Sequence, residues 1–279
     1  MSRMKIGSRF FNFKKEIAVM GILNVTPDSF SDGDCWLDPE KALEQALKMA
    51  EEGADLIDIG GESTRPGAPS VSLEEEKKRV LPVLKKIRPR LSIPISIDTQ
   101  KAALAREALE EGADLINDVS AATFDPEMAS VVGKAGCPLV LMHMRGRPET
   151  MQKEIIYRDV VGEVLQYLQQ RIESLSRIGV SRDRLIMDPG IGFGKEFEHN
   201  RQLLQNLRKF QTLECPVMVG VSRKSFLGKI SGRVPQDRLL ESVAASFYAA
   251  LNGASILRVH DVAETRRVLN VAEALLKRA

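Results

Sequence analysis

Basic side chains that could bind an anion fall in three loop-like segments of the chain. The segments cover residues 60–69, 219–226 and 256–261. Arg65 lies in the first, Lys224 in the second, and Arg258 and His260 in the third. A guanidinium is planar, always charged and suited to phosphate oxygens. If one fold brings these residues together, a diphosphate is the simplest ligand that uses so much positive charge.

Ser225 follows Lys224 and is placed to begin a helix. The free N–H groups of a helix N-terminus, together with the helix dipole, favour a carboxylate or a phosphate. Arg65 has an ordinary alternative, a surface ion pair with Glu62 or Glu74. Its glycine- and proline-bounded loop favours a role in binding.

Asp98, Asn117 and Asp188 form a second set with a different character. Two acceptors and one amide match the edge of a flat heterocycle that carries a 2-amino, N3–H and 4-oxo pattern. A metal site built from carboxylates is the alternative, and Asn117 weakens it because hard divalent cations prefer more anionic oxygen ligands.

Residues 21–33 form a third chemically dense segment, which begins with Asn24 after an apolar run. It contains hydroxyl groups, carboxylates, proline, glycine and the aromatic Phe30. A strand-to-helix turn usually takes about 2–6 residues, and this segment is longer. We therefore expect a mobile loop that closes over a substrate.

Eight short apolar runs, each followed by a helical stretch, are the elements that must position these residues. The runs cover residues 17–23, 55–59, 93–97, 114–116, 138–142, 184–187, 216–221 and 255–259. Such runs are typical of parallel strands that are covered on both faces. Nearly every run ends in a polar residue or a glycine turn, and polar groups at the carboxyl ends of barrel strands face the catalytic mouth. The sequence predicts a single (β/α)8 TIM barrel.

Helices are expected between the strands, and one domain is expected over residues 1–279. The predicted helices cover residues 39–52, 73–87, 101–111, 158–178, 201–210, 237–252 and 263–277. A barrel of this kind needs about 250 residues, and no linker interrupts the alternation. Residues 4–13 are interpreted as an N-terminal hairpin at the barrel floor.

Composition excludes several classes of function. The net charge is +2, from 40 basic and 38 acidic residues, which gives no field that would recruit nucleic acid or a membrane surface. The apolar stretch 17–25 is too short to span a bilayer. The three cysteines are widely spaced and suggest neither a disulfide framework nor a zinc site. We expect a cytoplasmic protein.

Motifs along the whole chain resemble those of the dihydropteroate synthase family of bacterial folate synthesis, in its stand-alone form. They cover residues 24–33, 60–67, 96–99, 116–118, 188–195, 222–226 and 258–261. The resemblance implies a transferase that joins (7,8-dihydropterin-6-yl)methyl diphosphate to 4-aminobenzoate. The products would be 7,8-dihydropteroate and diphosphate, with Mg²⁺ as cofactor and a homodimer as the assembly.

The resemblance also implies roles for individual residues. The pterin would be held by Asp98, Asn117, Met142, Asp188, Lys224 and Arg258. The diphosphate would contact Asn24, Thr64, Arg65, Arg258 and His260, with Mg²⁺ bound at Asn24. The aminobenzoate slot would be formed by Phe30, Pro66, Phe193, Lys224 and Ser225. The catalytic residues would be Asn24, Asp32, Arg65, Lys224, Arg258 and His260.

No dedicated base is required, because an arylamine is already neutral near pH 7. The difficult step is cleavage of the C–O bond, and cations with Mg²⁺ stabilise the departing diphosphate. This favours a dissociative, SN1-like reaction in which Asp32 shields the pterin cation. A pterin-binding methyltransferase barrel is one alternative, but it would need no diphosphate site. A catalytically silent folate-binding barrel is the other, and the intact charged loops argue against it.

Overall fold

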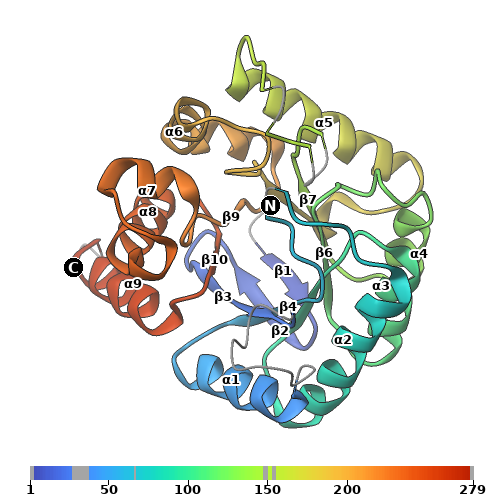
Figure 1. The fold of residues 1–279 in the computed structure, drawn as a ribbon. Helices are drawn as coiled ribbons and strands as arrows, with labels where there is room; N and C mark the ends of the chain where they lie inside the picture. The colour runs from blue at the N-terminus through green and yellow to red at the C-terminus, as the bar shows by residue number, and fades with distance from the viewer. Residues whose placement is uncertain (1–2, 27–37, 66, 147–149, 153–154, 277–279) are drawn as a thin grey trace.

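The computed structural model describes residues 3–26, 38–65, 67–146, 150–152 and 155–276. Within them, eight parallel strands form one sheet that curls into a barrel, and helices surround it (Figure 1). The order of strands is β8-β7-β6-β5-β4-β3-β10-β9. The two ends of this order meet where the Met187 N–H donates to the Pro216 carbonyl at 2.8 Å. The prediction of a (β/α)8 barrel is confirmed.

The strands are short and deeply buried, as strands covered on both faces must be. Their bounds are β3 (Ala18–Asn24), β4 (Leu56–Gly60), β5 (Ile95–Asp98), β6 (Leu115–Asp118), β7 (Leu139–Met142), β8 (Leu185–Asp188), β9 (Met218–Val219) and β10 (Ile256–Val259). Every position of β4 to β8 is buried. Only β9 is much shorter than expected from residues 216–221. At its start the Val217 N–H donates to Ser255 Oγ at 3.3 Å and not to the backbone of a neighbouring strand.

Helices follow the strands, and several begin at a side-chain cap. Their bounds are α1 (Pro39–Glu51), α2 (Leu73–Ile87), α3 (Ala102–Glu110), α4 (Met128–Ala135), α5 (Val160–Arg177), α6 (Phe197–Gln205), α7 (Ser225–Ser231), α8 (Leu239–Leu251) and α9 (Val262–Leu276). Asp38, Ser72 and Asp159 accept backbone N–H groups at the starts of α1, α2 and α5. No helix in the described part of the chain combines the length and apolar character needed to cross a membrane.

Two helical regions differ from the sequence prediction. The α4 helix was not expected, and α6 begins four residues before the predicted start at 201. His199 accepts the Glu196 N–H at 3.2 Å, which supports the early start. The predicted helix 201–210 ends at Gln205, and a 3-10 helix, Leu207–Leu213, continues from there.

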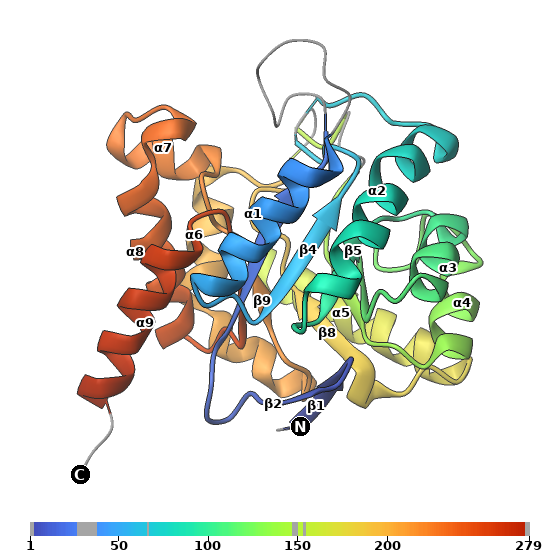
Figure 2. The same ribbon diagram turned by 90° about the horizontal axis from the view of Figure 1, so that it is seen from below.

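The N-terminal hairpin closes the amino end of the barrel, as predicted. It consists of β1 (Arg3–Ile6) and β2 (Arg9–Asn12), which pair antiparallel. Figure 2 shows the hairpin below the barrel. Its side chains Met4, Ile6 and Phe11 are buried in one cluster with inward-facing residues of the strands. The apolar partners in that cluster are Ala18, Met20, Leu56, Leu115, Val140, Ile186, Met218 and Ile256.

Candidate functional site

Strand alternation places a polar layer directly above this apolar cluster. In a strand, side chains two residues apart point to the same face. The residues two positions beyond Leu56, Leu115, Val140, Ile186 and Ile256 therefore also face the barrel interior. They are Asp58, Asn117, Met142, Asp188 and Arg258. The barrel interior thus changes from apolar to charged within one layer, toward the carboxyl ends of the strands.

A cavity opens above the polar layer at the carboxyl ends of the strands. Nine of the predicted site residues line it, and they are Asn24, Thr64, Arg65, Asp98, Phe193, Lys224, Ser225, Arg258 and His260. Asn117, Met142 and Asp188 lie deeper and are almost fully buried. The structure therefore gathers the predicted anion-binding and heterocycle-binding residues at one end of the barrel.

Arg258 lies at the centre of the site and contacts two carboxylates. Its Nε donates to Asp58 Oδ2 at 2.5 Å, and its Nη2 donates to Asp98 Oδ2 at 2.8 Å. Burial raises the pKa of Asp98, while Arg258 acts in the opposite direction. In this structure the Arg258 guanidinium thus donates to Asp98, the carboxylate that was predicted to accept a hydrogen bond from a heterocycle.

Asp58 is a site residue that the sequence analysis missed. Its side chain is fully buried, and Oδ2 accepts from Asn117 Nδ2 at 3.0 Å as well as from Arg258. The residues predicted to line the site lie mostly just past the apolar runs, whereas Asp58 lies inside the run 55–59. The available signal was a carboxylate in the interior of that apolar run, with apolar residues on both sides of it.

Lys224 connects the deep layer to the wall of the cavity. Its Nζ donates to the Ile191 carbonyl and lies 4.6 Å from the centroid of the Phe193 ring. Burial lowers the pKa of Lys224 to about 8, and Asp188 opposes this shift. Burial likewise raises the pKa of Asp188, which accepts the Gly190 N–H at 2.7 Å. Lys224 is therefore a cation that loses its charge only slightly above neutral pH.

His260 is held by Ser222, which lies on the neighbouring loop. Its Nδ1 lies 2.9 Å from Ser222 Oγ. Burial lowers the pKa of His260 to about 4, and Arg223 and Arg258 lower it further. The sequence analysis counted His260 among the cations, but the structure makes it a neutral hydrogen-bonding group at pH 7.

The loop that carries Thr64 and Arg65 is tied to the helices behind it. Lys101 pairs with both Glu62 and Glu76, and Arg79 donates to the Gly61 carbonyl at 3.0 Å. No ion pair of Arg65 with Glu62 or Glu74 is found within the described residues, which removes the alternative for Arg65. Arg65 is exposed at the rim of the cavity.

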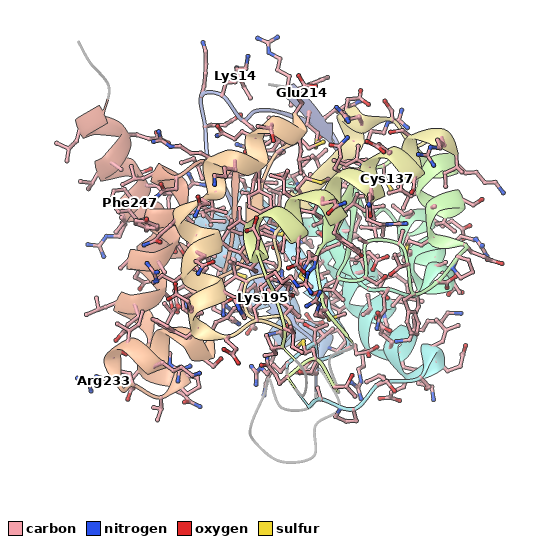
Figure 3. All side chains as sticks on the ribbon, turned by 90° about the horizontal axis from the view of Figure 1, so that it is seen from above. Lys14, Cys137, Lys195, Glu214, Arg233 and Phe247 are labelled. Carbon is pink, nitrogen blue, oxygen red and sulfur yellow. The ribbon has the colours of Figure 1, made fainter. Side chains whose placement is uncertain are left out.

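The glycine-rich segment 190–195 forms a wall of the site, and its residues Gly192 and Phe193 line the cavity. Gly190 has a φ of +67°, and a Cβ there would lie 1.8 Å from the His143 carbonyl oxygen. The buried Lys195 fastens the segment, since its Nζ lies 2.9 Å from His143 Nδ1 and donates to the His143 and Phe193 carbonyls. Figure 3 shows Lys195 near the middle of the molecule, well separated from Lys14 at the hairpin end.

Three predicted site residues, Phe30, Asp32 and Pro66, lie outside the described residues. Their roles remain predictions. The same holds for the expected closure of the loop around Phe30.

Asn24, the predicted Mg²⁺ ligand, is the last residue of β3 and lines the cavity with Thr64 and Arg65. Within the described ranges, no group of three or more His, Cys, Asp or Glu residues could hold a metal ion. Mg²⁺ commonly binds through one or two protein oxygens together with substrate phosphates. The amide oxygen of Asn24 could supply one protein ligand to the ion, and the neighbouring cations would bind the phosphates that supply the others. This arrangement fits that mode of binding and does not fit a site built from protein ligands alone.

Comparison with known sequences gives a consistent result. Residues 20–260 match the family described as pterin binding enzyme. The chain is 46% identical to the dihydropteroate synthase of Synechocystis sp. over 273 residues, which cover 98% of this chain and 94% of that relative. It is 45% identical to the dihydropteroate synthase of Escherichia coli K12 over 258 residues, which cover 92% and 91% of the two chains.

Solved structures agree with the sequence comparison. The dihydropteroate synthase of Xanthomonas albilineans with 4-aminobenzoic acid has a TM-score of 0.93 and 44% identity, covering 100% of this chain and 99% of that one. The same enzyme in complex with 7,8-dihydropteroate gives a TM-score of 0.89 and 41% identity, with 99% and 100% coverage. With its barrel, its acceptor layer and these relatives, the chain belongs to the dihydropteroate synthase family of pterin-binding enzymes.

Proposed function

We infer that the protein is a dihydropteroate synthase. It condenses (7,8-dihydropterin-6-yl)methyl diphosphate with 4-aminobenzoate and releases 7,8-dihydropteroate and diphosphate. The observation that carries this function is one cavity with buried acceptors at its base and cations at its rim. A flat heterocycle with an anionic leaving group has the complementary distribution of donors and charge.

The pterin ring occupies the deep layer. Asp98, Asn117 and Asp188 accept the hydrogen-bond donors of the heterocycle, and Lys224 donates to its acceptors. Met142 and Arg258 pack on the faces of the ring. Burial supports this assignment, since Asn117, Met142 and Asp188 are each at most 5% exposed.

The diphosphate lies at the rim of the cavity, where Thr64, Arg65, Arg258 and His260 contact it. His260 contributes a hydrogen bond, and the two arginines contribute charge. Asn24 is the residue that would hold Mg²⁺. When bound, the ion supplies further charge stabilisation to the leaving oxygen.

Aminobenzoate binds against Phe193 and Lys224, with its carboxylate at Ser225. The α7 helix begins at Ser225, so backbone N–H groups face that carboxylate. Phe30 and Pro66 complete the slot in this proposal. The slot therefore adjoins the pterin through Lys224, which contacts the Phe193 ring.

The reaction is dissociative. The C–O bond breaks first, and its electron pair leaves with the diphosphate while the dihydropterin delocalises the cation. The lone pair of the arylamine then forms the new C–N bond, and the nitrogen loses a proton to solvent. Arg65 and Arg258 stabilise the charge that develops on the leaving group, and Asp32 shields the cation.

The test is product formation by the purified protein. With the pterin diphosphate, aminobenzoate and Mg²⁺, dihydropteroate and diphosphate should appear in equal amounts. Supplying a methyltetrahydrofolate and a thiol acceptor instead should give no methyl transfer. Methyl transfer without diphosphate release would support the methyltransferase alternative, and pterin binding without either product would support a silent binding barrel.

We further propose a homodimer that forms through the α7, α8 and α9 helices, which lie side by side (Figures 1 and 2). Large apolar side chains are exposed on this surface. They are Ile230, Leu240, Tyr248, Leu251, Val271 and Leu275. Exposed large apolar side chains gathered on neighbouring helices favour a protein contact. Sedimentation equilibrium should give twice the chain mass for the wild type, and a monomer for a Leu240→Glu, Leu275→Glu double variant.

We also propose a cytoplasmic location. Cys137 and Cys215 are free and buried, and burial raises the pKa of each thiol to about 11. Both are suited to a reducing compartment, where neither needs a disulfide partner.

A further inference from the structure

Asp58 occupies a position from which it can organise the site without touching the reacting atoms. Its side chain is 0% exposed, and Oδ2 accepts from both Arg258 and Asn117. Its other oxygen, Oδ1, has no hydrogen-bond partner among the described residues. An incompletely satisfied buried carboxylate lowers stability. Its position therefore calls for a functional explanation.

We propose that Asp58 is a positioning residue that lets Arg258 release Asp98 to the pterin. The proposal rests on the proposed function. In this structure Arg258 bridges the two carboxylates through different nitrogens, Nε to Asp58 and Nη2 to Asp98. A pterin that takes Asp98 breaks only the second bond. The Nε bond to Asp58 then keeps the buried guanidinium paired.

This pairing matters because an unpaired buried charge is costly. Without the Asp58 carboxylate, Asp98 would be the one remaining carboxylate that pairs with Arg258 among the described residues. The guanidinium would then stay on Asp98 and compete with the pterin for it. Asp58 thus makes Asp98 available to the ligand.

The same carboxylate also sets the orientation of the Asn117 amide. Because Asn117 Nδ2 donates to Asp58 Oδ2, the amide oxygen is the atom directed away from Asp58. Asn117 is thereby presented as an acceptor. Together with Asp98 and Asp188 it gives three acceptors, which selects a heterocycle with a donor-rich edge.

The experiment compares Asp58→Asn with Asp55→Asn. Asp55 is a matched control, because it is also buried and paired with arginines, Arg9 and Arg266, but it lies just before β4, at the hairpin end of the barrel. Binding of 6-hydroxymethylpterin is measured by calorimetry, and KM for the pterin diphosphate and kcat are measured separately. Unfolding in urea gives the stability of each variant.

We expect Asp58→Asn to weaken pterin binding and to raise KM by about tenfold or more, the scale of a charge-assisted hydrogen bond, with a smaller change in kcat. Asp55→Asn should lower stability and leave pterin affinity unchanged. In an Arg258→Gln background, Asp58→Asn should cost clearly less pterin affinity than in the wild type, because no guanidinium remains to compete for Asp98 and only the contact with Asn117 is altered. An equal loss of affinity in both backgrounds, or unchanged affinity in Asp58→Asn, would overturn the proposal.

A measurement on the wild type covers the case in which Asp58→Asn does not fold. The Nε–H signal of Arg258, assigned by its loss in Arg258→Gln, should exchange slowly with solvent both without ligand and with saturating 6-hydroxymethylpterin. Its Nη signals should change on binding. Fast exchange of Nε–H in the complex would show that Arg258 leaves Asp58, and the proposal would fail. A wild type that binds no pterin at all would overturn the proposed function as well, and this is seen before any variant is compared.

Discussion

The two ends of the barrel use buried charge in opposite ways. At the hairpin end, Asp55 accepts the Val19 N–H at 2.9 Å and pairs with Arg9 and Arg266. At the mouth, Asp58 Oδ1 has no hydrogen-bond partner among the described residues. The buried hydroxyl of Ser96 has none there either. Asp55 at the hairpin end therefore has its partners within the chain, whereas the mouth keeps buried polar atoms that have no partner among the described residues.

The pKa shifts at the mouth are those of a buried, charged binding site. The large shifts at the mouth belong to Asp98, Lys224 and His260, and burial moves each toward its neutral form. Strongly shifted pKa values of this kind cluster at functional sites. The contrast between the two ends predicts that substitutions at the hairpin end alter stability, while those at the mouth alter binding and rate.

The largest expected effect is on stability, at the hairpin. Phe11→Ala removes a fully buried ring that stacks on Phe13 at 5.5 Å. It should cost about 3–5 kcal/mol of unfolding free energy, with kcat unchanged at temperatures where the variant is folded. Phe10→Ala is the control, since Phe10 is 69% exposed, and it should cost less than about 0.5 kcal/mol. Equal losses in urea unfolding would show that the hairpin does not close the barrel in solution.

At the mouth, Arg258→Ala and His260→Ala should each lower kcat by about 10²–10³. Both groups act on charge that develops as the diphosphate leaves. Arg266→Ala, an arginine of the hairpin end, should reduce stability and leave kcat unaltered. Steady-state assays with saturating substrates test this, and near-normal turnover in both mouth variants would contradict the assignment of the diphosphate site.

The barrel could be predicted from the sequence because its strands are buried on both faces and its helices are amphipathic. The continuous apolar runs of the strands differ from the helical spacing of apolar residues, and the two patterns alternate along the whole chain. The α4 helix was missed because Met128–Ala135 is short and starts without a side-chain cap. The extent of β9 was overestimated because apolar character does not reveal that the Val217 N–H donates to the Ser255 hydroxyl.

The site was predictable where function places polar groups at strand ends. Asp98, Asn117 and Asp188 were found in this way. Asp58 was missed because it lies before the end of its strand, and His260 was taken as a cation because the sequence does not reveal burial. The pairing of Arg258 with two carboxylates depends on contacts 160 and 200 residues apart in the chain, which no local pattern encodes.

Two substitutions at opposite ends of β8 test the comparison between the two ends of the barrel more closely. Asp188→Asn at the mouth end of β8 should weaken pterin binding by about 10–100-fold, the scale of a hydrogen bond to a charged group. Asp183→Asn precedes the same strand and is exposed, so it should leave affinity unchanged. Calorimetry with a pterin provides the measurement. Unchanged affinity in Asp188→Asn would refute its role as an acceptor.

The smallest expected effect is a pH dependence set by Lys224. Burial lowers its pKa to about 8, so its charge declines as the pH rises from 7 to 9. Because kcat/KM reports the ionisation of the free enzyme, it should fall along an alkaline limb with a midpoint near pH 8.

Stability should move in the opposite direction over the adjoining range. Between pH 8 and the unperturbed value of 10.5, the unfolded lysine binds a proton that the folded one has lost, so this group's contribution to stability increases with pH. Lys224→Arg keeps its charge at every pH of the assay, and it should remove both effects while lowering the absolute rate. The profile of kcat/KM from pH 6 to 9.5, together with urea unfolding from pH 8 to 10.5, distinguishes the two proteins. If the alkaline limb persists unchanged in Lys224→Arg, another group causes it, and the mouth does not depend on the charge of Lys224.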